Sequence, residues 1–515
     1  MQVLKKTAIV AVLLLPAFFL LHNYNELFGF IKISQLLVYG AIIYTPVFIC
    51  LLTMYLTRKW NIKSSLILFS ILFLLLLFGP INNYARHITH SGIFGSRYTI
   101  LIICIILLML IIRKIIKSKT ISSQTVFFVN LAVVCLITTE VVMVFLNAQE
   151  LKRTKNLIYP DKTLSQQFVS PNLPDSAKPD IYFFVFDEYT NNETLQKLWN
   201  YNNDTITNWL LSSGFHLPAK PSANYSFTIY SVSSTFNMNY IDPKKGSDGT
   251  IPLNVLQANE SLSDNETFNI LKKENYDIHF LAPFDNKIET TPTHFFDYIS
   301  NKQIQAQTLP GVFAESELWS SIAAKFFNGE DKSSLYAKSL QEKYQIIRST
   351  VEKIKSTTDS NVNRKPHFVY GHLMVPHEPH MFDKAGKFLT YDEYLKSNAF
   401  NTYTPQITYG NSLMKEIVSY IKQHNKRNTI IIIEGDHGFR GFIEDGIDWF
   451  NRTPDSLKRY FLPNFNAVYF PDGNYSKIYD HISPINTFRV LFDQFFHQNF
   501  PMLKDTGTVV KDTIY

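Results

Sequence analysis

Acidic and imidazole side chains stand directly after two apolar stretches of this 515-residue sequence. Residues 429–434 read TIIIIE, and Asp436 and His437 follow at once; the stretch DIYFFVF runs into Asp187 and Glu188. Carboxylate oxygens and imidazole nitrogens that face one point form a ligand set suited to Zn²⁺ or Mn²⁺. A lone Asp-His-Gly after a strand is more often a capped turn, so a metal site requires that several such ends converge.

A third apolar stretch carries two further imidazoles. The segment HFVYGHLMV, residues 367–375, contains His372, and the PHEPH stretch that follows contains His377. Prolines keep PHEPH out of a helix, so by itself it would be interpreted as a surface loop. Three apolar stretches that each end in potential ligands favour one shared site over three unrelated turns.

A hydroxyl-rich segment could supply a nucleophile for such a site. Residues 222–240, SANYSFTIYSVSSTFNMNY, are apolar at helical spacing and rich in Ser and Thr. A Thr or Ser at the start of a helix lies at the positive end of the helix dipole, where phosphate binds well. A divalent cation would lower the pKa of that hydroxyl. The alternative is an ordinary N-cap, which composition alone favours.

These residues need a scaffold, and the pattern of the second part of the chain predicts one. Apolar strands without polar alternation are separated by amphipathic helices, which is typical of a mostly parallel α/β sheet with helices on both faces. In such sheets ligands bind beyond the carboxyl ends of the strands. The predicted strands are 180–186, 276–284, 367–375, 429–434 and 466–470, and two predicted helices are 334–354 and 407–424.

The first part of the chain is different, because apolar runs dominate it. Most runs approach the ~20 residues that cross a bilayer, which predicts a five-helix transmembrane domain over residues 1–147. Residues 148–178 are predicted to be a linker, and residues 179–515 a catalytic domain. A cleaved signal peptide is the alternative for the first run. The runs are about 7–22, 35–57, 64–80, 98–112 and 124–147.

The distribution of charge predicts the topology. Residues 1–150 contain twelve Lys or Arg and three acids, whereas the remainder has 37 bases and 40 acids. The basic character therefore belongs to the apolar part, and a nucleic-acid partner loses its support. Nine of the twelve basic residues fall on one side of the predicted spans. The positive-inside rule then predicts a cytoplasmic N-terminus and an extracytoplasmic catalytic domain. Glu140 lies inside the fifth run, either in a functional role or near the outer interface.

Together these segments resemble the alkaline phosphatase superfamily in its sulfatase-like branch, and most closely its membrane-bound lipid A phosphoethanolamine transferases and lipoteichoic acid synthases. PDIYFFVFDEY is similar to their first metal-binding motif, TIYSVSS to the segment of their nucleophile, and HLMVPHEP and GDHG to their later motifs. The resemblance implies Glu188 as a metal ligand with Asp187 beside it, Thr228 as both nucleophile and ligand, His372 and His377 as catalytic residues, and Asp436 and His437 as ligands.

The resemblance also implies a function. We expect transfer of a phospho-headgroup, of phosphoethanolamine or phosphoglycerol type, from a phospholipid donor to an envelope glycan or lipid acceptor through a phospho-Thr228 intermediate. The cofactor would be Zn²⁺ or Mn²⁺, and the location a bacterial cytoplasmic (inner) membrane. Two alternatives stay open: a phosphodiesterase or phosphatase with water as acceptor, and a non-catalytic envelope-assembly protein.

The sequence departs from the family pattern in several places. The transferases have a further His about a dozen residues after their DHG motif, where this chain offers Asp445 and Asp448, with Arg440 as a possible phosphate contact. The Cys- or Ser-x-Pro-x-Arg signature of formylglycine formation is absent, which speaks against sulfate-ester hydrolysis. All three cysteines, Cys50, Cys104 and Cys135, fall in the apolar runs, so no disulfide is expected in the catalytic domain.

Overall fold

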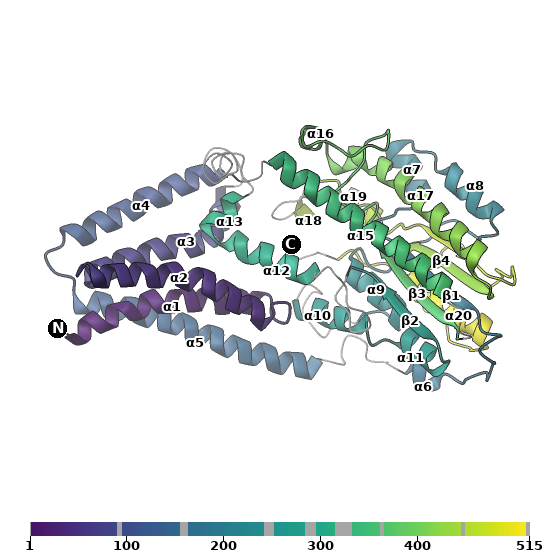
Figure 1. The fold of residues 1–515 in the computed structure, drawn as a ribbon, viewed down its shortest axis with the longest axis horizontal. Helices are drawn as coiled ribbons and strands as arrows, with labels where there is room; N and C mark the ends of the chain where they lie inside the picture. The colour runs from purple at the N-terminus through teal and green to yellow at the C-terminus, as the bar shows by residue number, and fades with distance from the viewer. Residues whose placement is uncertain are drawn as a thin grey trace. The chain divides into compact units, whose positions relative to one another are not determined.

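The chain divides into two units, which are described separately. One contains residues 1–154 and 296–329, and the other residues 155–295 and 330–514. We call them the helical unit and the α/β unit (Figure 1). The computed structural model describes residues 2–89, 95–154, 163–241, 252–283, 295–314, 332–360, 365–443 and 449–510.

Each of the five apolar runs lies in a long helix of the helical unit. The helices are α1 (Gln2–Glu26), α2 (Ile33–Leu56), α3 (Ile62–Thr89), α4 (Arg97–Lys117) and α5 (Ser123–Thr154). Four of them, α2 to α5, contain stretches long and apolar enough to cross a membrane, so five spans are not confirmed. In α1 the side chains of residues 2–9 lie outside the described part.

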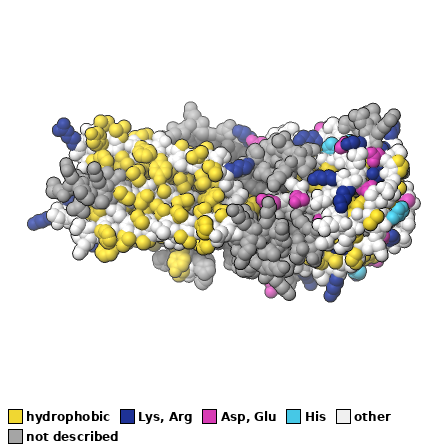
Figure 2. Space-filling view, turned by 90° about the horizontal axis from the view of Figure 1, so that it is seen from below, with side chains coloured by type: hydrophobic (Ala, Val, Ile, Leu, Met, Phe, Trp, Pro, Cys, Tyr) yellow, Lys and Arg dark blue, Asp and Glu magenta, His cyan; other side chains and the backbone are white. Residues whose placement is uncertain are grey.

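The surface of the helical unit suits a membrane. Exposed apolar side chains are abundant on α2, α4 and α5, whereas α1 is largely buried among its neighbours. Figure 2 shows hydrophobic side chains over much of the described surface of this unit and charged side chains on the α/β unit. Because exposed apolar patches of this extent are rare on water-facing surfaces, these helices are expected to face lipid.

Two short helices from the middle of the chain also pack in the helical unit. They are α12 (Phe295–Gln307) and α13 (Leu309–Ala314). The ring of Phe313 lies 5.7 Å from that of Phe78 on α3 and 5.5 Å from that of Tyr98 on α4. A Cβ on Gly79 would lie 2.2 Å from the carbonyl oxygen of Ala306, so only glycine permits this close approach.

The α/β unit is built on a five-stranded sheet of order β2-β3-β1-β4-β5. Strands β1 to β4 are mutually parallel, and β5 runs antiparallel to β4. All five predicted strands are present, and the prediction of a mostly parallel sheet is confirmed. The strands are β1 (Asp180–Phe186), β2 (Asp277–Leu281), β3 (His367–Leu373), β4 (Thr429–Gly435) and β5 (Asn466–Tyr469).

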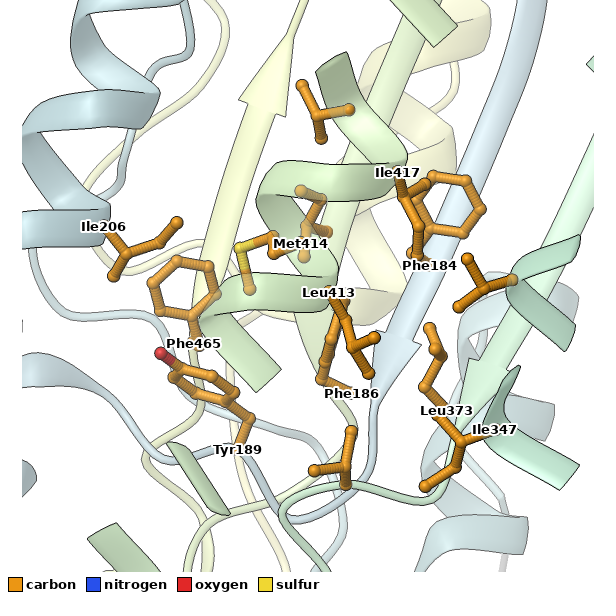
Figure 3. Packing of buried hydrophobic residues seen from close by; sticks show 14 of the residues in the cluster. Phe184, Phe186, Tyr189, Ile206, Ile347, Leu373, Leu413, Met414, Ile417 and Phe465 are labelled. Carbon is orange, nitrogen blue, oxygen red and sulfur yellow. The ribbon is translucent and has the colours of Figure 1, made fainter. Parts of the chain in front are cut away.

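Alternation along β1 divides its buried side chains between two layers of helices. One face carries Phe184 and Phe186, which belong to a core with residues of α15 (Lys332–Ser360) and α17 (Ala399–His424) (Figure 3). The other carries Phe183, whose ring lies 5.7 Å from Phe236 and 5.2 Å from Phe488. Those two rings belong to α9 (Thr228–Asn237) and α20 (Pro484–Phe496). Each fully buried aromatic or aliphatic side chain contributes about 1.5–3 kcal/mol, so both layers are fixed firmly to the sheet.

The region predicted to be a linker, residues 148–178, contains two helical stretches. They are the last residues of α5, which belong to the helical unit, and α6.

Shorter elements complete the α/β unit. The remaining elements are α6 (Leu164–Gln167), α7 (Asn192–Trp199), α8 (Asp204–Ser212), α10 (Pro252–Ser261), α11 (Glu266–Lys273), α16 (Tyr391–Lys396), α18 (Trp449–Arg452), α19 (Asp455–Lys458) and a 3₁₀ turn (Arg459–Phe461).

Candidate metal centre

The ends of β1 and β4 bring three buried ligand groups together. Asp187 follows β1, and Asp436 and His437 follow β4, its parallel neighbour. One ligand atom from each of the three lies within 4.8 Å of the others. His437 Nε2 is 3.7 Å from Asp187 Oδ1 and 3.5 Å from Asp436 Oδ2. The expected convergence of strand ends therefore occurs for these three residues.

The donor set of this cluster fits a divalent cation. Asp187 Oδ1 and Asp436 Oδ2 are buried and have no hydrogen-bond partner in the described part of the chain. His437 Nδ1 lies 2.8 Å from the carbonyl oxygen of Gly438, which can only accept, so Nδ1 carries the proton. The lone pair of a neutral ring's Nε2 then faces two carboxylate oxygens. A cation would satisfy all three acceptors, and oxygen with nitrogen ligands is a set that Zn²⁺ and Mn²⁺ accept.

Thr228 reaches the same point from a helix. It is the first residue of α9, and its Oγ1 lies 3.4 Å from His437 Nε2. The N-cap of α9 is Phe227, which leaves Thr228 outside the capping position. Ser231, one turn further, donates from Oγ to the carbonyl oxygen of Asp436 at 2.6 Å and so ties the helix to the loop. An ordinary N-cap, the alternative for this segment, therefore does not account for the position of Thr228.

Glu188 lies beside Asp187 but outside the group of three. Its Oε1 accepts the Arg440 backbone N–H at 2.6 Å, and its own N–H donates to Asp436 Oδ1 at 2.9 Å. Its backbone has φ of 63°, in the left-handed region that side chains usually avoid. The hydroxyl of Tyr403 donates to the Glu188 carbonyl at 2.6 Å and stabilises this turn. Burial raises the pKa of Glu188 against the opposing charges of His377, His437 and Arg440.

The two histidines of the third predicted stretch occupy different environments. His372 is buried on β3, with Nε2 3.1 Å from Asp187 Oδ2. His377 is half-buried beyond the strand, and its Nδ1 donates to the carbonyl of Glu378 at 2.7 Å. Burial lowers the pKa of His377, but the carboxylates of Asp187 and Glu188 outweigh it, so the pKa lies above its usual value. His372 thus contacts Asp187, whereas His377 is suited to hold a proton, and the catalytic role of both histidines stays a prediction.

Three further residues were not singled out in the sequence. Tyr370 bonds to His372, Tyr403 holds the Glu188 turn, and Lys343 of α15 donates to the carbonyl oxygens of His377 and Pro379. Burial lowers the pKa of Lys343 to about 7, against the attraction of Asp187, Glu378 and Glu188. Of these three, only Tyr370 could have been found from the sequence, because residues two apart on a strand share a face and Tyr370 stands two residues before His372.

Two sequence predictions near the site have other outcomes. Asp445 and Asp448, the proposed replacements for a missing His, lie outside the described residues. Arg440 lies at the site's edge, where its Nη1 donates to the carbonyl of Ser226 at 3.0 Å. Its role as a phosphate contact stays a prediction.

A family model matches part of this domain. Residues 228–481 match the model described as Sulfatase, so this part of the chain is similar to that family. The matched segment begins at Thr228 and includes the histidines after β3 and the Asp-His pair after β4, whereas Asp187 and Glu188 precede it. The resemblance to the sulfatase-like branch of the alkaline phosphatase superfamily is thereby confirmed. No curated protein sequence matches the chain at a significant level.

Several solved structures are similar to the chain at low identity. The C-terminal periplasmic domain of EcEptC from Escherichia coli, in complex with Zn, is 11% identical over 64% of this chain and 86% of that one, with a TM-score of 0.38. The integral membrane protein lipooligosaccharide phosphoethanolamine transferase A (EptA) from Neisseria meningitidis is 12% identical over 96% and 95%, with a TM-score of 0.40. The periplasmic domain of phosphoethanolamine transferase EptC from Campylobacter jejuni is 14% identical over 66% and 92%, with a TM-score of 0.36.

Proposed function

We propose that this protein is a membrane-embedded, metal-dependent transferase of phospho-headgroups. The donor would be a phospholipid, the transferred group of phosphoethanolamine or phosphoglycerol type, and the acceptor an envelope glycan or lipid. One observation carries the proposal: a helix-initiating hydroxyl, Thr228 Oγ1, lies 3.4 Å from His437 Nε2 beside two buried carboxylate oxygens without hydrogen-bond partners in the described structure. The sulfatase-family match over residues 228–481 supports the same class of chemistry.

The ligands of the metal would be Asp187, Asp436, His437 and Thr228. Glu188, the ligand implied by the family motif, has one oxygen bonded to the Arg440 N–H, so we assign it to holding that turn. A bound divalent cation lowers the pKa of a hydroxyl and neutralises charge that develops on phosphoryl oxygens.

The transfer would then proceed in two displacements at phosphorus. Thr228 Oγ, present as the alkoxide at the start and at the end of the cycle, attacks the donor phosphorus, so that an Oγ–P bond forms while the P–O bond to diacylglycerol breaks. His377, whose raised pKa favours the protonated ring, gives a proton to the departing oxygen. An acceptor hydroxyl next attacks the phosphorus, returns a proton to His377 and releases Thr228.

Membrane helices would keep this chemistry at the bilayer that holds its donor. Within the described residues, four helices are long and apolar enough to cross a membrane, and lipid donors are confined to the bilayer. The nine-to-three bias of basic residues supports an extracytoplasmic catalytic domain in a bacterial cytoplasmic membrane. A reporter enzyme fused after Tyr515 that functions only in the cytoplasm would contradict this orientation.

The decisive experiment is intact-protein mass spectrometry of the full chain purified with native lipids. We expect a phospho-headgroup mass adduct that maps to Thr228, disappears in Thr228→Ala and survives in Thr235→Ala. Thr228→Ser should retain part of it, because a primary alcohol can also be deprotonated at a metal. An adduct on Ser231, or one undiminished in Thr228→Ala, would contradict the assigned nucleophile.

The same preparation separates the alternatives. Turnover of the adduct only when a glycan or lipid acceptor is added supports a transferase, and equal turnover in water alone indicates a phosphodiesterase. A protein that binds no divalent metal and forms no adduct would be a non-catalytic envelope-assembly domain.

A further inference from the structure

The carboxylate of Asp187 is hydrogen-bonded to His372, which is in turn hydrogen-bonded to Tyr370. The proposed reaction uses neither His372 nor Tyr370. His372 Nε2 lies 3.1 Å from Asp187 Oδ2, and His372 Nδ1 lies 2.8 Å from the hydroxyl of Tyr370. All three side chains are buried, with at most 2% of each residue exposed. They form a continuous chain from the interior of the sheet to its edge.

The strand register explains why these side chains meet. Tyr370 and His372 are two residues apart on β3 and therefore point to the same face. Their partners on β1 are Phe183 and Val185, and Asp187 is the next residue of that face. The N–H of Asp187 donates to Leu373 O at 3.0 Å, and its carbonyl accepts from His377 N at 3.1 Å. The backbone of Asp187 is thus fixed on both sides before its side chain is placed.

The chemistry of the three groups sets the direction of the hydrogen bonds. An ionised carboxylate only accepts, so Nε2 of His372 must donate to Asp187. In a neutral ring Nδ1 then accepts, and the Tyr370 hydroxyl donates to it. Burial keeps that hydroxyl protonated, since it raises the pKa of Tyr370 well above its usual value.

We propose that Tyr370 and His372 are positioning residues that orient a metal ligand. They hold Asp187 Oδ2, so that Oδ1, without a hydrogen-bond partner in the described residues, faces His437 Nε2 at 3.7 Å and is available to a divalent cation. This rests on the proposed metal site and deepens it. Outer partners of this kind fix ligand orientation and typically change metal affinity by roughly 10–100-fold when removed.

The surroundings of Tyr370 make a clean test possible. Its ring packs against Phe183, Phe236 and Phe280, with centroids 5.7, 5.0 and 4.9 Å away. Tyr370→Phe therefore keeps the packing and removes only the hydroxyl. The matched control is Tyr182→Phe, since Tyr182 is equally buried on β1 but donates to Thr358 Oγ1 at 3.2 Å.

The experiment measures Zn²⁺ affinity of the full chain in detergent, stripped with a chelator and titrated against a chromophoric competitor. We expect Tyr370→Phe to weaken binding about 10-fold and His372→Ala about 100-fold, as outer partners do. His372→Gln should fall between them, because its amide can still donate to Asp187. Tyr182→Phe should remain within about two-fold of wild type, since its hydroxyl touches no ligand.

The outcomes separate this proposal from the proposed function. Equal Zn²⁺ affinity in Tyr370→Phe and Tyr182→Phe would overturn the positioning role, whatever His372→Ala does to folding. A wild type that binds Zn²⁺ with these variant effects but never forms an adduct on Thr228 would refute headgroup transfer and leave the positioning role standing. A wild type that binds neither Zn²⁺ nor Mn²⁺ would overturn both.

Discussion

A carboxylate beside an imidazole occurs in both units of this protein, but its hydrogen bonding differs. In the helical unit Glu140 of α5 has Oε1 2.8 Å from His22 Nδ1, and its Oε2 accepts from Asn25 Nδ2 at 2.6 Å. Both partners lie on α1. In the α/β unit Asp187 and Asp436 each keep one buried oxygen with no hydrogen-bond partner among the described residues.

This difference in hydrogen bonding distinguishes a carboxylate with a structural role from carboxylates of a candidate metal site. A buried polar atom without a partner costs ~1–3 kcal/mol, and more when the group is charged. Glu140 avoids that cost because α1 satisfies both of its oxygens, so it joins two helices. The pair Asp187 and Asp436 carries that cost in the described structure, and the proposed cation would relieve it. An acid in an apolar run, which the sequence marked as a functional hint, is therefore here a helix contact.

The largest expected effect comes from the same amide substitution made in each unit. Asp436→Asn should weaken Zn²⁺ binding by more than the roughly 100-fold typical of lost outer partners, because a neutral amide replaces a charged ligand. Glu140→Gln should leave Zn²⁺ affinity unchanged. Competition titration of both full-length variants in the same detergent provides the measurement.

A loss of Zn²⁺ affinity in Glu140→Gln as large as that in Asp436→Asn would remove the distinction between the two regions. Melting temperatures of both variants, measured without metal, show whether either change simply unfolds the chain.

Glu434 is a third kind of buried carboxylate, because both of its described partners are neutral donors and its protonation should make stability depend on pH. Burial raises the pKa of Glu434 from 4.5 to about 7, although Thr487 and Asn466 donate to it. Between these pH values the folded chain binds more protons than the unfolded one. The contribution of Glu434 to the free energy of unfolding is therefore fully present below pH ~4.5 and is lost as pH rises to ~7. The shift corresponds to about 3 kcal/mol.

Thermal unfolding of metal-free wild type and Glu434→Gln from pH 4.5 to 8 tests this expectation. Since Gln does not titrate, the melting temperature of Glu434→Gln should rise relative to wild type as pH increases. A difference between the two proteins that is constant across the range would show that Glu434 is not held neutral.

A smaller effect is expected for the helix contact itself. Glu140→Ala should lower the free energy of unfolding by about 1–2 kcal/mol, the upper range for hydrogen bonds within membrane helices. The measurement is thermal unfolding in detergent of Glu140→Ala, His22→Ala and the double variant. Coupling of about 0.5–1.5 kcal/mol between the two positions is expected for residues in contact, and strict additivity would argue against the pair.

The smallest effect is expected for the Ser231 hydroxyl, which ties α9 to the loop after β4. Ser231→Ala removes the bond to the Asp436 carbonyl and should cost about 1 kcal/mol of stability. Thr235→Ala is the matched control, since its Oγ1 only donates back to Ser231 O at 2.9 Å. Thermal unfolding of both variants is the measurement, and a loss of stability in Thr235→Ala as large as that in Ser231→Ala would show that the contact with Asp436 adds nothing of its own.

The sequence by itself determined the features that depend on neighbouring residues. Five strands were predicted because unbroken apolar runs bounded by turns indicate buried parallel strands. The pair Asp436 and His437 was found because adjacency after a strand fixes both at the sheet edge. The apolar helices followed from length and composition, and within the described residues four of the five, α2 to α5, are long and apolar enough to cross a membrane.

The tertiary structure decided features that depend on distant groups. The sequence offered both Asp187 and Glu188 as metal ligands. In the structure an oxygen of Asp187 joins the group with Asp436 and His437, whereas Glu188, with φ of 63°, has Oε1 bonded to the Arg440 N–H. His372 became a support for Asp187 because the register of β3 against β1 places it there. Residues 296–329 belong with the helical unit, since packing of α13 on α3 and α4 is a long-range contact that local patterns do not encode.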